Sequence, residues 1–254
     1  MANAKFEVPF PPNDPICDYL PGSPERASLK KRYVELKNQK IEIPLIIGGK
    51  EIKTGDMGEC VLPHDHKHVI ATFHKAGKKE VEMAIEAAME ARKLWAELPW
   101  EDRVAVFLKA ADLLTTPFWR DTLNAATTLN QSKNVFQAEI DAACELIDFF
   151  KFNAYYLQTI YADQPNSSPG VWNRMEYRGL EGFILAVTPF NFTSICANLC
   201  AAPALMGNVC VWKPSNTQIY SAIVIMDLFK EAGGRSDALP GPWTSRLLGI
   251  GNSE

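Results

Sequence analysis

Two continuously apolar segments that lie close together in the sequence constrain the fold of this chain most. They are "FILAVTPF" at 183–190 and "NVCVWKP" at 208–214, and a segment rich in small residues separates them. A strand that is apolar at every position is typical of a parallel sheet covered on both faces. An apolar-faced helix, "YSAIVIMDLFKEAGG", follows and ends on glycines, as helices often do. The order strand, helix, strand, helix predicts half of a doubly wound nucleotide-binding unit, and therefore an α/β protein.

Polar and turn-forming residues follow both segments at their carboxyl ends, where open α/β sheets bind their ligands. The neutral amide of Asn191 can donate a hydrogen bond to an oxyanion without exchanging a proton. Lys213 suits ribose hydroxyls or a phosphate. Two ordinary interpretations stay open, because asparagine also caps helices and a lysine after a strand is often only solvated. The residues that leave the strands are Thr188, Pro189, Phe190, Asn191 and Phe192 after the first, and Trp212, Lys213, Pro214 and Ser215 after the second.

The first part of the chain predicts a helix and a hairpin. An early helix is expected near 25–38. Gly48 and Gly49 separate two extended runs, which is a strong signal for a β-hairpin. A further strand, "HVIATFH", is expected at 68–74.

The middle of the chain has the periodicity of helices. Apolar residues at helical spacing predict one amphipathic helix from Lys79 and a second after Pro99. A long helix is expected at about 135–161, and it has an acidic row beside its apolar stripe. Spacing alone favours a solvated face for that row. Its members are Asp141, Glu145 and Asp148.

Composition excludes several classes of function. A net charge of -4, without a long run of Lys or Arg, argues against nucleic acid as a partner. No apolar run approaches the roughly 20 residues that span a bilayer, and the start, "MANAKFEVPFPPNDPIC", resembles neither a secretory signal nor a mitochondrial presequence. The six cysteines are scattered and form no CxxC pair, which indicates reduced thiols. We therefore expect an intracellular, cytoplasmic chain.

"TPFNFTSI" and "VWKPS", at this separation, resemble the aldehyde dehydrogenase superfamily. Further segments resemble the branch of that superfamily that oxidises glutamate gamma-semialdehyde, also known through its cyclic form, pyrroline-5-carboxylate. They extend from about Gly22 to Gly233. The segments are "GSPERASLKK", "FLKAADLL", "QAEIDAACELIDFFKFN", "RGLEGF" and "APALMGNVCVWKPSNT".

The resemblance implies an aldehyde dehydrogenase-like α/β fold and an NAD-dependent oxidation of glutamate semialdehyde to glutamate in proline degradation. It also implies a homo-oligomer, no metal, and the mitochondrial matrix if the source is eukaryotic. It assigns roles to individual positions of this sequence. Asn191 would be the side-chain donor of the oxyanion hole, Thr188, Pro189 and Phe190 would border the nicotinamide, Lys213 and Ser215 would lie by the adenosine ribose, and Glu145 and Phe192 would line the aldehyde site.

The sequence departs from the family in the parts that carry the chemistry. The phosphate loop, the glutamate base, the nucleophilic cysteine and the carboxylate anchor follow this region in the family, and their motifs are not found here. Cys196 and Cys200 have only apolar neighbours in sequence, so neither is expected to replace the nucleophile. Losing a covalent nucleophile costs far more rate than the about 10²–10³ that an oxyanion donor contributes. We therefore expect a truncated, inactive form.

Five regions are expected along the chain. The first (1–78) holds an amino-terminal arm, helix and hairpin, and the second (79–169) is helical and packs on the cofactor domain. An extended arm of oligomerisation type (170–182) turns near Gly179. Half of an NAD-binding Rossmann unit, with an incomplete parallel sheet, occupies 183–234. The tail (235–254) lacks the apolar run of a third parallel strand, and we expect it to come from a shifted reading frame or an alternative ending.

Two interpretations from other classes stay open. His64, His66 and His68 alternate in "PHDHKHV", so in a strand they would share one face and could hold a metal. A surface strand edge is the simpler interpretation of the same pattern. Alternatively, the chain is a non-catalytic fragment that associates with full-length subunits through its arm, whose unpaired edge favours aggregation.

Overall fold

The computed structural model describes residues 5–233 and 245–246. Its helices are α1 (Pro24–Lys37), α2 (Lys78–Trp95), α3 (Trp100–Thr115), α4 (Pro117–Gln131), α5 (Val135–Ala138), a π-helix (Glu139–Cys144), α6 (Glu145–Ala162), α7 (Thr193–Leu205), a 3-10 helix (Asn216–Gln218) and α8 (Ile219–Ala232). Its strands are β1 (Ile41–Ile43), β2 (Leu45–Ile47), β3 (Lys50–Ile52), β4 (Met57–Leu62), β5 (Asp65–His74), β6 (Ile184–Val187), β7 (Cys210–Lys213) and β8 (Ser245–Arg246).

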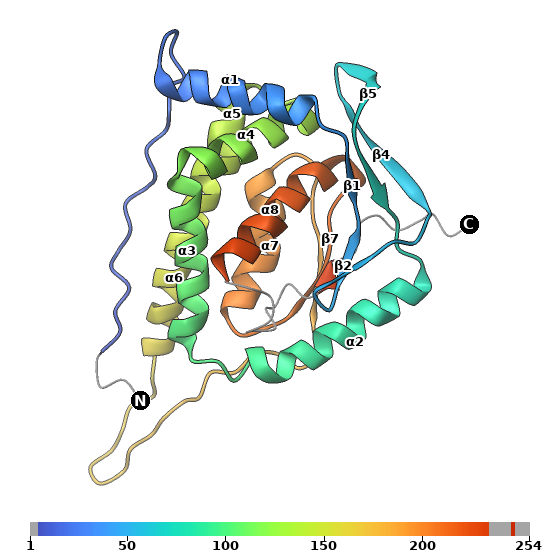
Figure 1. Cartoon of the computed structure of the whole chain (residues 1–254). Coiled ribbons are helices and arrows are strands. Elements are labelled where there is room, and N and C mark those ends of the chain that lie inside the picture. The colour runs from blue at the N-terminus through green and yellow to red at the C-terminus, as the bar shows by residue number, and fades with distance from the viewer. Residues whose placement is uncertain (1–4, 234–244, 247–254) are drawn as a thin grey trace.

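The helices are arranged in layers beside the strands. In Figure 1, α3 and α6 stand side by side on one side of the molecule, α7 and α8 occupy the centre, and the strands lie on the other side. Helix α1 closes one end and α2 the other. Three buried rings join α3, α6 and α8: Phe150 lies 5.9 Å from Phe107 and 5.6 Å from Phe229 between ring centroids. Apolar burial of this kind is the main stabilising contribution to such a core.

The larger sheet has the strand order β3-β2-β8-β7-β6. Strands β6 and β7 are parallel and in register from Ile184 opposite Cys210 to Val187 opposite Lys213, which confirms the predicted parallel pair. The two residues of β8 also pair parallel with β7, and β2 joins the sheet antiparallel through β8. The expectation that both faces of the first strand are covered is wrong within the described residues, because Leu185 and Val187 are 60% and 62% exposed. Strand β6 is the edge of this sheet.

The predicted hairpin is confirmed. Strands β2 and β3 pair antiparallel with Ile47 opposite Lys50. Gly48 and Gly49 connect them with φ angles of 57° and 74°. A two-residue turn with positive φ at both positions matches the twist of the strands, and glycine adopts it without steric cost.

Helix α4 and strand β4 are among the elements that the sequence patterns missed. Helix α4 buries six polar or charged residues beside its apolar ones; they include Asp121, Asn124 and Thr127. Strand β4 pairs antiparallel with β5 and completes a smaller sheet of order β1-β5-β4. The expected long helix is present as α5, the π-helix and α6.

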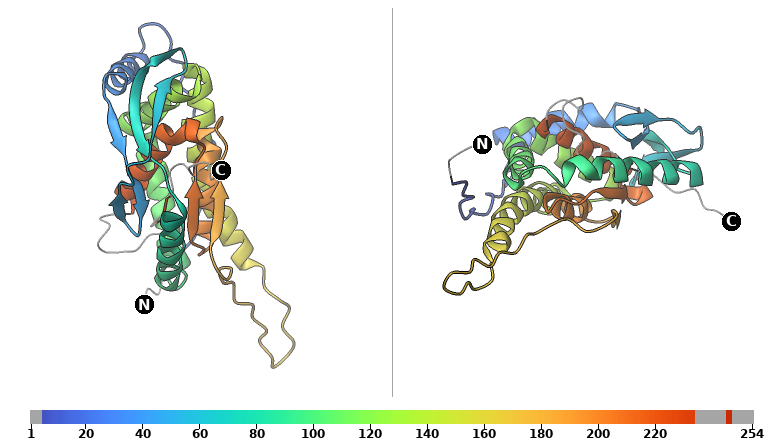
Figure 2. Two further views of the ribbon diagram at one scale, coloured as in Figure 1. Left: turned by 90° about the vertical axis from the view of Figure 1, so that its right-hand side faces the viewer. Right: turned by 90° about the horizontal axis from the view of Figure 1, so that it is seen from below.

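The arm at 163–183 projects from the body as a long loop without paired strands (Figure 2). Its turn lies at Pro169 and Gly170, where Gly170 has φ of 76°, so the turn expected near Gly179 is misplaced. Gln164 links the two limbs, because its side chain accepts from the Met175 amide at 2.9 Å. Gly179 has another role: a Cβ there would lie 2.8 Å from the Gly207 carbonyl oxygen, so glycine permits the base of the arm to pack on the α7–β7 loop.

The predictions about the tail and about membrane spans depend on which residues the structure describes. The tail at 235–254 lies outside them apart from the two residues of β8. Among the described helices, none combines the length and the hydropathy that crossing a membrane requires.

Candidate active site

The turn between β6 and α7 is fixed from inside by Thr188. Its backbone amide donates to the Lys213 carbonyl at 3.1 Å, and the Trp212 indole donates to its hydroxyl oxygen at 3.0 Å. The same oxygen lies 3.2 Å from the Cys196 sulfur. Thr188 is 4% exposed. Its side chain therefore joins the ends of the two parallel strands, and only its backbone and the residues after it face outward.

Asn191 lies at the outer point of this turn. It is exposed, and its side chain makes no hydrogen bond within residues 5–233 and 245–246. The preceding Phe190 is 63% exposed. Helix α7 begins at Thr193, and no side chain caps its amino terminus. Free amides at a helix start and a free side-chain amide both favour negative charge at the same end of α7.

Two side chains expected at an aldehyde site flank the start of α7. The Ser194 hydroxyl donates to Glu145 Oε2, which brings the first residue of α6 to the second residue of α7. The Phe192 ring lies 4.2 Å from Lys133 Nζ, a cation–π contact. Lys133 is also paired with Asp141. Glu145 and Phe192 therefore reach the same helix end from two sides.

The acidic row is not the solvated face that its spacing favours. Asp141 pairs with Lys133, Glu145 accepts from Ser194, and Asp148 accepts from the Asn13 side chain and the Asp14 amide, both at 2.7 Å. A groove of about 650 Å³ lies beside Glu145 and Asp148. Its other walls are aromatic residues of α6 and the amino-terminal segment around Asn13.

Lys213 and Ser215 leave the second parallel strand at the same sheet edge as Thr188, because Lys213 is the register partner of Val187. Lys213 is half-buried and has no ion pair within the described residues. The Ser215 hydroxyl lies 3.2 Å from that of Thr217. An unpaired ammonium and a hydroxyl beyond a parallel strand suit the hydroxyl groups of a ribose.

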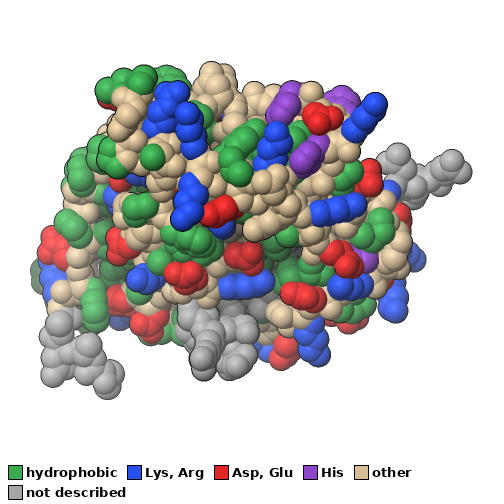
Figure 3. Space-filling view, turned by 45° about the horizontal axis from the view of Figure 1, so that its top comes forward, with side chains coloured by type: hydrophobic (Ala, Val, Ile, Leu, Met, Phe, Trp, Pro, Cys, Tyr) green, Lys and Arg blue, Asp and Glu red, His purple; other side chains and the backbone are tan. Residues whose placement is uncertain are grey.

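The three alternating histidines do not assemble into a metal site. His64 lies in the turn between β4 and β5, and His68 Nε2 lies 2.7 Å from the Lys37 carbonyl oxygen. Histidine side chains gather in one region of the surface shown in Figure 3. In the part of the chain that the structure describes, no three His, Cys, Asp or Glu residues are grouped to bind a metal.

A model of the aldehyde dehydrogenase family matches residues 52–240. The chain belongs to the aldehyde dehydrogenase family. The matched region contains the parallel strands, the Asn191 turn and the helices that flank it. The α/β fold and the resemblance predicted from the sequence are thereby confirmed.

Relatives within this family have related names. The chain is 50% identical over 238 residues to the probable delta-1-pyrroline-5-carboxylate dehydrogenase of Schizosaccharomyces pombe, covering 93% of the chain and 43% of that relative. It is 48% identical over 221 residues to the mitochondrial delta-1-pyrroline-5-carboxylate dehydrogenase of Homo sapiens, covering 87% of the chain and 39% of the relative.

Solved structures of this family agree with the fold. The delta-pyrroline-5-carboxylate dehydrogenase from Mycobacterium tuberculosis superposes with a TM-score of 0.93 and 46% identity over 99% of this chain and 46% of that one. A structure of the same enzyme bound with NAD gives a TM-score of 0.92 and 47% identity, with coverage of 99% and 46%. This member of the family therefore spans less than half the length of the relatives it matches.

The family resemblance implies a cysteine nucleophile, so the environments of the six thiols decide whether one of them could take that role. All six are free. Burial raises the pKa of the Cys60, Cys144 and Cys210 thiols to about 12. Burial likewise raises the pKa of Cys200 well above its ordinary value. Cys196 is fully buried against Thr188. Since the thiolate is the nucleophilic form, these environments suppress nucleophilicity.

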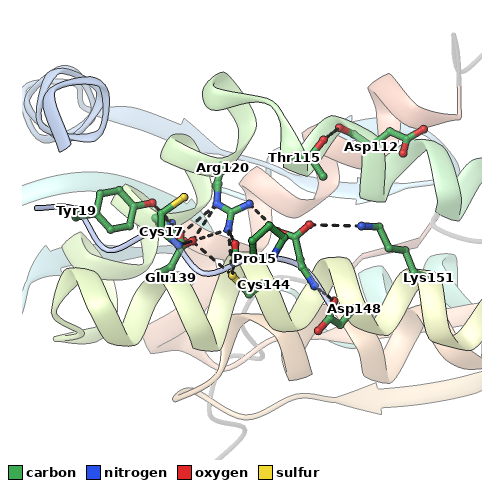
Figure 4. Close-up of polar contacts among 12 residues, drawn as sticks. Pro15, Cys17, Tyr19, Asp112, Thr115, Arg120, Glu139, Cys144, Asp148 and Lys151 are labelled. Atoms are coloured by element: carbon green, nitrogen blue, oxygen red, sulfur yellow. Dashed lines mark hydrogen bonds and ion pairs between the residues drawn. The ribbon is translucent and has the colours of Figure 1, made fainter. Parts of the chain in front are cut away.

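A buried ionic network lies between the amino-terminal segment and helices α4 and α6 (Figure 4). Arg120 Nη2 lies 2.5 Å from Glu139 Oε1, and Arg120 Nη1 lies 2.7 Å from Asp14 Oδ2. The other Glu139 oxygen accepts from the Tyr19 hydroxyl at 2.8 Å and from Asn124 Nδ2 at 2.7 Å. Glu139 is fully buried. The network holds the amino-terminal segment beside the groove at Glu145.

Proposed function

We propose that this chain forms the oxyanion side and the adenosine-ribose side of a pyrroline-5-carboxylate dehydrogenase site. The supporting observation is the exposed Asn191 amide, which has no partner in the described chain and lies at the uncapped start of α7. An amide so placed can donate to an oxygen that gains negative charge and can do so without losing a proton. The names of the relatives support the substrate, glutamate semialdehyde or its cyclic form.

NAD is the cofactor that we propose, and it accepts a hydride when bound. The residues present suit one part of it. Lys213 and Ser215 would contact the adenosine ribose, and Thr188, Pro189 and Phe190 would border the nicotinamide. The Thr188 hydroxyl is already used by Trp212, so its contribution would be through the backbone. Glu145 and Phe192 would form the wall of the aldehyde site.

We also propose that this chain alone does not turn over. The argument rests on its thiols, since burial raises the pKa of five of them and the sixth is enclosed beside Thr188. Without a thiolate, no nucleophile attacks the aldehyde carbonyl, so the oxyanion donor has no developing negative charge to stabilise.

The purified chain is therefore expected to form no NADH from glutamate semialdehyde above a protein-free control. The assay includes Asn191→Ala and Cys196→Ser, and circular dichroism checks folding. NADH formation that both substitutions abolish would contradict the proposed inactivity. A parallel NAD titration followed by nuclear magnetic resonance is expected to shift the Lys213 and Ser215 signals, and Lys213→Ala is expected to weaken that binding. Unchanged signals would contradict the cofactor role.

The arm at 163–183 supports a second proposal, association with further copies of the family's subunits. Trp172 beside its turn is 83% exposed and Leu180 at its base is 63% exposed, while β6 leaves a free sheet edge. Large exposed aromatic residues are typical anchors of protein interfaces. We expect the chain to elute as more than a monomer in size-exclusion chromatography and Trp172→Glu to shift it toward the monomer. A monodisperse monomer of the unchanged chain would count against association.

We retain a cytoplasmic location as a proposal, with the mitochondrial matrix for a eukaryotic source. Relatives from Dictyostelium discoideum and Mus musculus have the word mitochondrial in their names.

A further inference from the structure

Gln131, the last residue of α4, makes three hydrogen bonds around the Asn191 turn. Its Oε1 accepts from the Thr193 hydroxyl at 2.7 Å and from the Ser221 hydroxyl at 3.0 Å. Its Nε2 donates to the Phe190 carbonyl oxygen at 3.1 Å. One side chain thus connects the start of α7, the first turn of α8 and the turn itself.

The orientation of the Gln131 amide is determined by its partners. The two hydroxyl groups can donate to Oε1, and only Nε2 can then face the Phe190 carbonyl. A reversed amide would set its oxygen against that carbonyl, which is also an acceptor. The Thr193 proton is committed to Gln131, so Thr127, whose hydroxyl lies 2.8 Å from that of Thr193, donates to Thr193. The chain of donors therefore runs from α4 to α7 and back to Gln131.

The bond to Phe190 acts on Asn191 through the peptide between them. The Phe190 carbonyl and the backbone amide of Asn191 belong to one planar unit, because rotation about the peptide bond is strongly hindered. A hydrogen bond that fixes the carbonyl therefore fixes the plane from which the Asn191 side chain departs. Asn191 has no side-chain hydrogen bond of its own in the described chain, so no such bond competes with this plane in setting the direction of its side chain.

We infer that Gln131 is a positioning residue: it orients the Phe190–Asn191 peptide, from which the side chain of Asn191 and its amide extend. The importance of that orientation for catalysis rests on the oxyanion role proposed above. The orientation itself does not, and it is measurable in the chain without substrate or cofactor.

Gln131→Glu tests the inference. At neutral pH the introduced carboxylate still accepts from Thr193 and Ser221 but has no proton for the Phe190 carbonyl. We expect the Asn191 amide signal to move in nuclear magnetic resonance spectra. We also expect the Cys196 amide, which donates to the Phe192 carbonyl, to exchange about fivefold faster, as loss of about 1 kcal/mol of hydrogen bonding implies.

Acid is expected to reverse this effect. A protonated carboxyl, like the glutamine amide, can donate through one end and accept through the other, so both readouts should return toward the unchanged chain below a pH of about 4. Gln131→Met has similar length without either group, and its effect should be the same at every pH. Ser221→Ala is the matched control: it removes one donor to Oε1, leaves the Phe190 bond and should leave the Asn191 signal in place.

Gln131→Glu readouts equal to the unchanged chain at neutral pH would overturn the inference. So would readouts that stay altered in acid while the chain is folded, since the effect would then be one of packing. If acid unfolds the variant, the neutral comparison of Gln131→Glu with Ser221→Ala decides, because equal effects of the two also contradict it. A failed dehydrogenase assay leaves all these results unaffected.

Discussion

Glu139→Ala is expected to lower the free energy of unfolding by about 3–5 kcal/mol, because it leaves a buried cation without its main partner. Arg120 and Glu139 have side chains that are 10% and 0% exposed. The substitution removes the acceptor of Arg120 and also that of the Tyr19 hydroxyl and the Cys17 amide. Asp14 remains, but it binds a different nitrogen of the guanidinium and also faces Lys151.

Urea denaturation followed by circular dichroism measures the loss. The matched control is Glu90→Ala, which breaks the exposed Glu90–Lys93 pair, whose side chains are 76% and 69% exposed. Exposed pairs contribute about 0–1 kcal/mol, so this variant should unfold close to the unchanged chain. Equal losses for Glu139→Ala and Glu90→Ala would contradict the role given to the network.

The pH dependence of the same variant has a definite sign. Burial raises the pKa of Glu139, but the hydrogen bonds from Arg120, the Cys17 amide and Tyr19 lower it by more. The net result is a pKa below the ordinary value. A carboxyl group with a lowered folded-state pKa stabilises the fold above its unfolded-state pKa of about 4.3, and the contribution is lost as pH falls through the folded-state value. The stability difference between the unchanged chain and Glu139→Ala should therefore be full at pH 7 and shrink below a pH of about 4.

Trp95→Ala should destabilise the chain by about 3–5 kcal/mol, the usual cost of truncating a buried aromatic side chain. Trp95 is 1% exposed at the end of α2, and its indole donates to the Ala204 carbonyl in α7 at 2.8 Å. It thereby joins α2 to α7, the helix that lies between the two parallel strands in the sequence. The loss should also speed amide exchange at Gly207, whose amide donates to the same carbonyl at 3.0 Å.

Two tryptophan variants separate the causes of this loss. Trp95→Phe keeps much of the volume and removes the indole donor, so it should cost less than the alanine variant while still exposing Gly207 to exchange. Trp172→Ala truncates a side chain that is 83% exposed and should change stability little. A Trp95→Ala midpoint in urea as high as that of Trp172→Ala would refute the packing argument.

Local patterns predicted the elements whose stability comes from one apolar face or one turn. The parallel pair followed from "FILAVTPF" and "NVCVWKP", and the hairpin from Gly48 and Gly49. Helix α4 was not predicted, although its buried apolar residues Trp119, Leu123 and Leu129 recur at helical spacing. Polar residues are buried among them, such as Thr127, which contacts Thr193. Buried polar residues of this kind obscure the apolar pattern by which a helix is recognised in a sequence.

The sequence predicted the site residues that lie at the ends of strands. It did not predict the contacts between side chains that are far apart in the sequence. The carboxyl ends of β6 and β7 fixed the positions of Asn191 and Lys213. The contacts of Glu145 with Ser194 and of Gln131 with Phe190 join residues 49 and 59 apart in sequence. Only the packing of α4, α6 and α7 brings these residues together, and the spacing of residues along the sequence does not predict how separate helices pack.

The π-helix at 139–144 lets one long helix serve two faces. Each residue of an α-helix turns the chain by about 100°, and a π turn accommodates one residue more than an α turn. Glu139, its first residue, faces Arg120, while Glu145, which follows it, faces Ser194. Loss of a single residue within this segment would make the helix uniform and turn one face relative to the other. A one-residue deletion would therefore sacrifice either the anchoring of the amino-terminal segment or the proposed wall of the aldehyde site.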